Sequence, residues 1–306
     1  MLWPQRGLWH NTFSQTVGSG TDTEARLKAA LAAAGSRVMG VANMAVQGIG
    51  EGHPLRLAAA TLGIPVNRGF ARGSVVAHDM PAAVTFGNLT LRIVGPTQSN
   101  LDELGAEWGE WLDKHEDNIA SGDPLLLANA DRSVPNLCSI TVFVGGDDKT
   151  MLFTGDGRSD HLLQGLKLAD LLDTRGNLWE DVLKLPHHGS NRNITKTFFT
   201  KVRASQYVIT ANGRDDNPNL ATLIWLVETA NRQHREVEIL LTNETLSTKK
   251  LQEEYDPVTS ACQPTLMEKG ADSMVHELAA QVKVLRNTAP AAGARHWRRT
   301  SPPTGP

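Results

Sequence analysis

Two short polar stretches, each placed after a run of apolar residues, carry the side chains best suited to chemistry. Asp156 lies in Leu-Phe-Thr-Gly-Asp-Gly, and His187 and His188 lie in Leu-Pro-His-His-Gly-Ser. A carboxylate can bridge metal ions or orient water, and an imidazole can bind a metal ion or transfer a proton. The pattern predicts part of a metal site with these three residues as ligands, in which Asp156 and His188 take part in catalysis.

Each stretch also has an ordinary structural interpretation. Gly-Asp-Gly is a common turn sequence, in which Asp156 would cap the helix that comes next. Two adjacent histidines in a loop carry little specificity by themselves, and their side chains point in different directions. If they belong to a site, one of them binds metal and the other supports it or contacts substrate. The sequence leaves open which histidine has which role.

The elements that would hold these residues can be predicted from the pattern after residue 136. Strands are predicted at about 139–144, 150–154, 181–185, 206–210 and 237–241, and helices at about 161–173, 194–201 and 220–234. Strands that alternate with helices indicate an α/β layered domain. In such folds the loops at the strand ends converge on one cleft, where Asp156 and the histidine pair would meet.

Upstream of residue 137 the sequence predicts fewer regular elements. Helices are expected after Thr21, over about 51–62 and over about 101–117, and a hairpin is expected to turn at Gly87-Asn88. From about residue 287 the chain is rich in Pro, Gly, Ala and Arg, which predicts a disordered tail over 287–306. Residues 1–286 are expected to form one domain.

The bulk composition narrows the class of protein. The chain has 306 residues, a formal net charge of -3, two cysteines and a hydrophobic fraction of 40%, which are ordinary values for a globular protein. This charge gives no overall reason to expect nucleic-acid or membrane binding, and no apolar run approaches the length of a membrane span. Two distant cysteines and a start unlike a signal peptide lead us to expect a cytoplasmic protein.

Taken together, these motifs are similar to those of a known family. The segment Leu152 to Ser190, with Asn136 to Val144 before it and the strand Tyr207 to Ala211 after it, resembles the second half of a metallo-β-lactamase-fold hydrolase. The nearest branch contains the C-terminal domains of ComEC-type DNA-uptake proteins. The resemblance covers about residues 84–243, with the family's second half at about 137–243. It implies an αββα sandwich that holds one or two zinc ions, or manganese, between its sheet edges.

The resemblance also implies roles for individual residues. Asp156 stands at the place of the family's bridging metal carboxylate, and one of His187 and His188 at the place of a late histidine ligand. Asn136 and Ser139 stand where the family has a middle ligand or a polar replacement for it. The reaction implied is metal-dependent hydrolysis, of the nuclease or phosphodiesterase kind rather than β-lactam hydrolysis.

The chain departs from the family in the first half of the site. The family's hallmark is His-x-His-x-Asp-His, yet no two of the ten histidines here are two positions apart. Asp160-His161 and His78-Asp79 imitate only its end, so they are expected to be ordinary surface residues. Leu8-Trp9-His10-Asn11 resembles the segment that comes after the hallmark in this family, so the sandwich is expected to be N-terminally incomplete. The turn at Asp216-Asn217-Pro218-Asn219 also lacks a histidine that the family often has.

The residues support two hypotheses about function. In the first, the chain is a metal-dependent hydrolase impaired by its missing ligands. On this hypothesis Ser190, Asn191 and Arg192 contact a phosphate of a phosphodiester or nucleic acid, and Asn136 also contacts the substrate. In the second, it is a non-catalytic binding protein or remnant with the same fold. Because a catalytic zinc ion usually has three protein ligands, we expect weak or absent metal binding. Missing strands would also leave a sheet edge exposed, which favours self-association.

Overall fold

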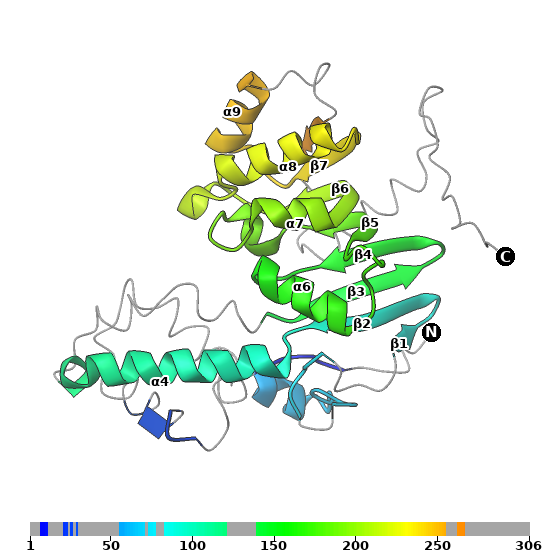
Figure 1. Cartoon of the computed structure of the whole chain (residues 1–306). Coiled ribbons are helices and arrows are strands. Elements are labelled where there is room, and N and C mark those ends of the chain that lie inside the picture. The colour runs from blue at the N-terminus through cyan, green and yellow to red at the C-terminus, as the bar shows by residue number, and fades with distance from the viewer. Residues whose placement is uncertain are drawn as a thin grey trace. The chain divides into compact units, whose positions relative to one another are not determined.

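The structure is a computed structural model that describes residues 7–11, 21–23, 25–26, 29, 55–70, 73–77, 83–120, 139–254 and 262–266. These residues have a mixed α/β architecture built around one eight-stranded sheet, in which the strands lie in the order of the sequence. Figure 1 shows helices in front of this sheet and one long helix along its lower end. Asn136 and the expected tail over 287–306 lie outside the described residues.

The sheet joins an antiparallel part to a parallel part. The antiparallel part contains β1 (Val84–Phe86), β2 (Leu89–Gly95), β3 (Thr141–Gly146) and β4 (Lys149–Phe153). The parallel part runs on from β4 through β5 (Leu178–Lys184), β6 (Val202–Ile209), β7 (Val237–Leu241) and β8 (Cys262–Leu266). Parallel pairing places the carboxyl ends of β4 to β7 at one edge of the sheet, where ligands collect in folds of this kind.

Helices connect the parallel strands. They are α6 (Ser159–Leu168), α7 (Lys196–Lys201) and α8 (Leu220–Arg232), and α9 (Leu246–Glu254) comes after β7. Two short 3-10 turns, η3 (Pro186–Gly189) and η4 (Arg214–Asp216), come after β5 and β6. Figure 1 shows α6, α7 and α8 together on one side of the sheet. Among the described residues, no helix combines the length and the apolar character that crossing a membrane requires.

The hydrophobic core lies between the sheet and these helices. Alternate positions of a strand face the same side, so every second apolar residue of a strand can face the helical layer. The core includes Leu152, Leu183, Tyr207, Ile239 and Leu241 from the sheet, and Leu162, Leu166, Phe198, Phe199, Leu223 and Leu226 from the helices. Complete burial of one such side chain contributes about 1.5–3 kcal/mol, so this cluster holds the strand ends in place.

The long helix α4 (Gln98–Ala120) begins with a reciprocal cap. The Thr97 backbone N–H donates to Asn100 Oδ1 at 3.0 Å, and the Asn100 backbone N–H donates to Thr97 Oγ1 at 3.2 Å. This arrangement satisfies two donors that a helix start leaves without intrahelical partners. It fixes the point at which the chain leaves β2 and enters the helix.

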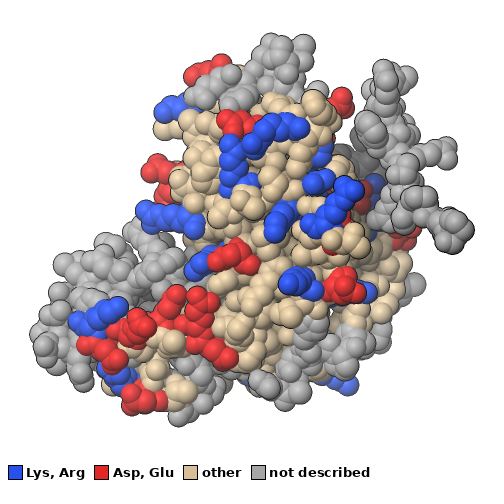
Figure 2. Space-filling model, viewed as in Figure 1, with Lys and Arg blue, Asp and Glu red and all other residues tan. Residues whose placement is uncertain are grey.

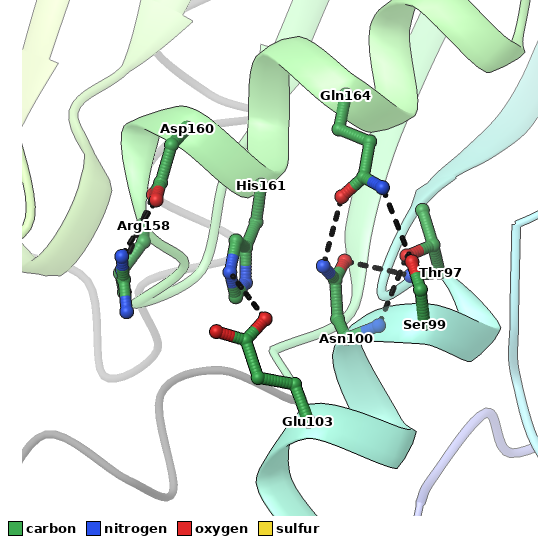
Figure 3. Close-up of polar contacts among 8 residues, drawn as sticks. All are labelled: Thr97, Ser99, Asn100, Glu103, Arg158, Asp160, His161 and Gln164. Atoms are coloured by element: carbon green, nitrogen blue, oxygen red, sulfur yellow. Dashed lines mark hydrogen bonds and ion pairs between the residues drawn. The ribbon is translucent and has the colours of Figure 1, made fainter.

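Polar side chains also tie α4 to α6 (Figure 3). Asn100 Nδ2 donates to Gln164 Oε1 at 3.0 Å, and Gln164 Nε2 donates to Ser99 Oγ at 3.1 Å. One turn further along α4, Glu103 Oε2 lies 3.5 Å from His161 Nε2. The His161 side chain is only 12% exposed, so the expectation that it is an ordinary surface residue is wrong. Packing of α4 over the start of α6 buries it.

The expected α/β class is confirmed, and the predicted hairpin at Gly87-Asn88 is present between β1 and β2. The expected strands and helices after residue 136 are present, but several begin or end at other residues than expected. β5 begins at Leu178 rather than near residue 181, and α6 ends at Leu168 rather than near residue 173. The described strands form one sheet, with the α/β layering that the sequence predicts.

Candidate functional site

The carboxyl ends of β4 and β5 bring Asp156 and the histidine pair together. Asp156 lies in the loop after β4, and His187 and His188 lie in η3, directly after β5. His188 Nε2 is 3.7 Å from Asp156 Oδ1, and each of these side chains is 39% exposed. Two segments far apart in the sequence therefore meet at one accessible point, because β4 and β5 are parallel neighbours.

The histidine turn has an unusual backbone. His187 and His188 both have positive φ angles, 43° and 55°. A non-glycine residue held in this region costs about 1–3 kcal/mol, and such residues cluster at functional sites. The turn is closed by the Ser190 backbone N–H, which donates to the His187 carbonyl at 2.9 Å. The His187 backbone N–H also donates to the Gly155 carbonyl at 3.1 Å, so the turn is hydrogen-bonded both within itself and to the Asp156 loop.

The ring of His188 is oriented by Thr210, the residue after β6. His188 Nδ1 is hydrogen-bonded to the Thr210 carbonyl, and Thr210 Oγ1 lies 3.2 Å from the same nitrogen. Because a carbonyl oxygen can only accept, Nδ1 carries a proton, and Nε2 is the ring nitrogen that lies toward Asp156. A separation of 3.7 Å between Nε2 and Asp156 Oδ1 is too long for a hydrogen bond. The two atoms are therefore placed like neighbouring ligands rather than like a hydrogen-bonded pair.

The ligand set nevertheless falls short of a catalytic metal centre. Two atoms that each lie about 2.1 Å from a tetrahedral zinc ion would be roughly 3.4 Å apart, so His188 and Asp156 fit two of the four ligand positions of such a site. In the part of the chain that the structure describes, no three His, Cys, Asp or Glu side chains come together as metal ligands. Since catalytic zinc usually has three protein ligands, the described residues do not fit the family's metal centre.

His187 differs from His188 in its surroundings. Its ring is partly buried, and burial lowers its pKa, although the nearby charge of Asp156 acts in the opposite direction. A side-chain hydrogen bond connects His187 to the buried Asn193, and Asn193 Nδ2 donates to the Asp156 carbonyl at 3.3 Å. His187 is thus a neutral group at neutral pH that holds the Asp156 loop, and His188 is the histidine that faces the carboxylate.

Two further residues, Ser139 and Lys184, hold the loop that carries Asp156. Ser139 Oγ accepts a hydrogen bond from the Asp156 backbone N–H at 3.1 Å, so Ser139 supports the loop through its hydroxyl group. Lys184 Nζ donates to the Gly155 carbonyl at 2.8 Å and lies 3.9 Å from Asp156 Oδ1. A lysine in a short strand ordinarily predicts a solvent-facing position, so the sequence carries no signal for this contact.

The polar loop after the histidines has mixed exposure. The side chain of Ser190 is buried, and its Oγ accepts from the Arg192 backbone N–H at 3.4 Å. Asn191 and Arg192 are exposed, and the Asn191 backbone N–H donates to Asn219 Oδ1 at 2.8 Å. Of the three residues of this loop expected to contact a phosphate, Asn191 and Arg192 present their side chains to solvent, and Asn136 lies outside the described residues.

No protein-family model matches this chain, and a comparison with curated proteins finds no significant relative. The basis for a function is therefore the arrangement of Asp156, His187, His188 and the residues that hold them.

Proposed function

We propose that this chain is a metallo-β-lactamase-fold protein of the phosphodiester-hydrolase kind, similar to the C-terminal domains of ComEC-type proteins, with an incomplete metal centre. The observation that carries the proposal is the convergence of Asp156 Oδ1 and His188 Nε2 at 3.7 Å, with His188 Nδ1 held by the Thr210 carbonyl. On this proposal the described sheet belongs to an αββα sandwich, and hydrolysis by the chain as it stands is weak or absent.

The order of the elements supports the proposal. A Thr-Gly-Asp turn after one strand and a His-His-Gly turn after the next are separated by one helix, α6, and the two strands pair in parallel through Leu152 and Leu183. This is the arrangement that the resemblance implies for the second half of the family's site. The metal of the family, zinc or manganese, would be held here by Asp156 and His188.

The weakness of the proposed activity is explained by the charges at the site. Asp156 and His188 Nε2 are close enough for one water molecule to donate to both, since hydrogen bonds are about 2.8 Å long. His188 could then take a proton from that water. Hydrolysis of a phosphodiester, however, also requires a positively charged group near the phosphoryl oxygens, because negative charge develops on them in the transition state. Lys184 Nζ lies 3.9 Å from Asp156 Oδ1, but its side chain is only 11% exposed, so it is poorly placed to contact substrate.

Surface charge favours a small phosphodiester over a long nucleic acid as the first substrate to test. Asp102, Glu103, Glu110 and Asp113 of α4 are exposed. Figure 2 shows acidic side chains gathered along this helix, with Lys and Arg side chains spread over the helices above it. Arg26 pairs with Asp113 and Lys114 pairs with Glu110. The acidic charge of Asp102 and Glu103 disfavours a polyanion along the first turns of α4, because like charges at an exposed surface oppose association.

The test is phosphodiesterase activity of the purified chain with bis(p-nitrophenyl) phosphate, with zinc or manganese added. We expect turnover no higher than that of the Asp156→Asn variant, because the described ligands cannot hold a complete metal centre. Asp148→Asn, in the exposed turn between β3 and β4, is the matched control. Turnover that Asp156→Asn abolishes and Asp148→Asn leaves intact would show that the chain is a competent enzyme.

A second candidate function is binding without catalysis. It is favoured by Lys184, whose ammonium group lies 3.9 Å from Asp156 Oδ1 and offsets the negative charge of that carboxylate without a metal ion and without contacting the ligand. A protein of this kind would bind a phosphodiester or another anionic ligand and release it unchanged with any metal. Binding of thymidine 5′-phosphate p-nitrophenyl ester without its hydrolysis, measured by calorimetry and by absorbance, separates this function from the first.

A further inference from the structure

A largely buried lysine contacts both loops of the candidate site. Lys184 is the last residue of β5, and its side chain is 11% exposed. Burial of an ammonium group is unfavourable unless hydrogen bonds and an opposite charge compensate it. Here the Gly155 carbonyl accepts from Lys184 Nζ at 2.8 Å, and Asp156 Oδ1 lies 3.9 Å away. Methionine would fill a similar volume at that position without this cost, so the charge calls for a specific explanation.

The Gly155 carbonyl is a shared acceptor between two parts of the site. In addition to Lys184 Nζ, the backbone N–H of His187 donates to this oxygen at 3.1 Å. A carbonyl oxygen has two lone pairs and can accept both hydrogen bonds at once. One oxygen atom therefore connects the Asp156 loop, the end of β5 and the histidine turn.

Ser139 and Thr154 also restrict the position of the Gly155 peptide. Gly155 has a φ angle of 53°, and a Cβ atom added there would lie 3.1 Å from Ser139 Cβ. Thr154 Oγ1 donates to the Lys184 carbonyl at 2.7 Å, so the same two strand ends are also joined through the main chain of Lys184. A displaced Gly155 carbonyl would therefore move Asp156 relative to the histidine turn.

We propose that Lys184 is a positioning residue, whose ammonium group fixes the Gly155 carbonyl and thereby sets the distance between Asp156 and His188. This inference rests on the proposed function only in taking Asp156 and His188 as the site. It concerns the chain before any ion or substrate binds. Lys184 does not contact substrate, and its effect passes through the backbone of Gly155.

The test compares Lys184→Met and Lys184→Arg by NMR, in the absence of metal and substrate. In Lys184→Met we expect amide exchange at His187 to accelerate about tenfold or more, because the Gly155 carbonyl that accepts from this amide is no longer held by a charged donor. The amide signals of Gly155 and Asp156 and the imidazole signals of His188 should shift as well. Lys184→Arg keeps the charge and the donors, so its exchange rate should stay within about threefold of wild type.

Lys149→Met is the matched control. Lys149 lies at the start of β4, is 64% exposed and pairs with Asp181 at 2.7 Å. Loss of this exposed pair should leave the signals of both loops unchanged, since surface ion pairs contribute little. Melting temperatures of all variants separate loss of the loop contact from general unfolding.

Unchanged signals at both loops in Lys184→Met, or an equal disturbance in Lys184→Arg and Lys184→Met, would overturn the assignment. If Lys184→Met does not fold, the wild-type ammonium protons decide the matter. A hydrogen-bonded Lys184 Nζ should give a resolved signal that exchanges slowly with water, and its absence overturns the assignment. Because no metal or substrate is present, a result here is independent of whether the wild-type chain binds zinc or hydrolyses a phosphodiester.

Discussion

The candidate site depends on single residues whose backbone conformations few side chains adopt. Gly189 ends the histidine turn with a φ angle of 86°, and a Cβ atom added there would lie 2.7 Å from Pro218 Cβ. The Gly189 carbonyl also accepts from the Asn219 backbone N–H at 3.1 Å. The turn is therefore packed directly against the loop before α8, which leaves no space for a side chain at this position.

Gly189→Ala is expected to destabilise the protein by about 1–3 kcal/mol, because it adds both a steric clash and an unfavourable φ angle. Urea unfolding monitored by circular dichroism measures the change. Gly176→Ala is the matched control, since Gly176 has a φ angle of 73° but nothing within 4 Å of an added Cβ. An equal loss of stability in both variants would show that close packing against Pro218 is unimportant.

For individual residues, the sequence predicts the site residues that directly follow strands. It does not predict the residues that hold those site residues in place. Asp156 and the histidine pair could be located because each comes after an apolar run and precedes a glycine. Lys184 and Thr210 could not, because their roles depend on which strands become neighbours. The contact between His188 and Thr210 exists only because β5 and β6 pair in parallel, and no local pattern encodes that pairing.

At the scale of elements, the contact between α4 and α6 has a titratable group at its centre. Burial lowers the pKa of His161, and Arg158 acts in the same direction, whereas Asp160 and Glu103 oppose the shift. Figure 3 shows these four side chains together, with Arg158 paired to Asp160 and His161 facing Glu103. The folded state therefore binds a proton at His161 less readily than the unfolded chain does.

Stability is consequently expected to fall as the pH drops below 6.5, the ordinary His pKa, because the unfolded state then takes up more protons than the folded state. His187 and His10 also have pKa values lowered by burial and contribute with the same sign. His161→Gln should reduce the difference in unfolding free energy between pH 7 and pH 5.5. His234→Asn, at an exposed position with positive φ, should retain the full difference. Equal pH dependence in wild type and His161→Gln would contradict this assignment.

Element bounds illustrate where local patterns mislead. The sequence places the start of β5 too late because Trp179 and Glu180 look unlike a buried strand, yet Glu180 is 0% exposed and pairs in register with Ala204. It extends α6 too far because the apolar run continues through Leu172. The structure ends the helix at Leu168, and Asp170 then adopts a φ angle of 52°. Tertiary pairing and turn geometry decide these bounds.

At the scale of the whole molecule, the described sheet ends at the short strand β1. Phe86 in this strand is 38% exposed, and Thr85 between it and Val84 is exposed as well. An edge strand offers backbone hydrogen-bonding groups to a second chain, and natural proteins usually protect such edges with charges or bulges. Self-association through this edge is therefore part of the proposed behaviour.

Light scattering should show an average mass that rises with protein concentration, because edge pairing is a bimolecular contact. Thr85→Lys places a charge on the edge and should return the chain to a monomer. Thr61→Lys, which changes an exposed threonine on the helical segment 55–61, should leave the association unchanged. A wild-type mass that stays at 33.2 kDa over the whole concentration range would contradict edge pairing.

Zinc binding by the purified chain, measured by calorimetry together with elemental analysis, tests the central claim most directly. Asp156 and His188 supply two ligand positions of a metal site, and the described residues supply no group of three. We expect at most one equivalent of weakly bound zinc, which Asp156→Asn abolishes. About two equivalents of tightly bound zinc would contradict the account, because they would require a complete binuclear centre.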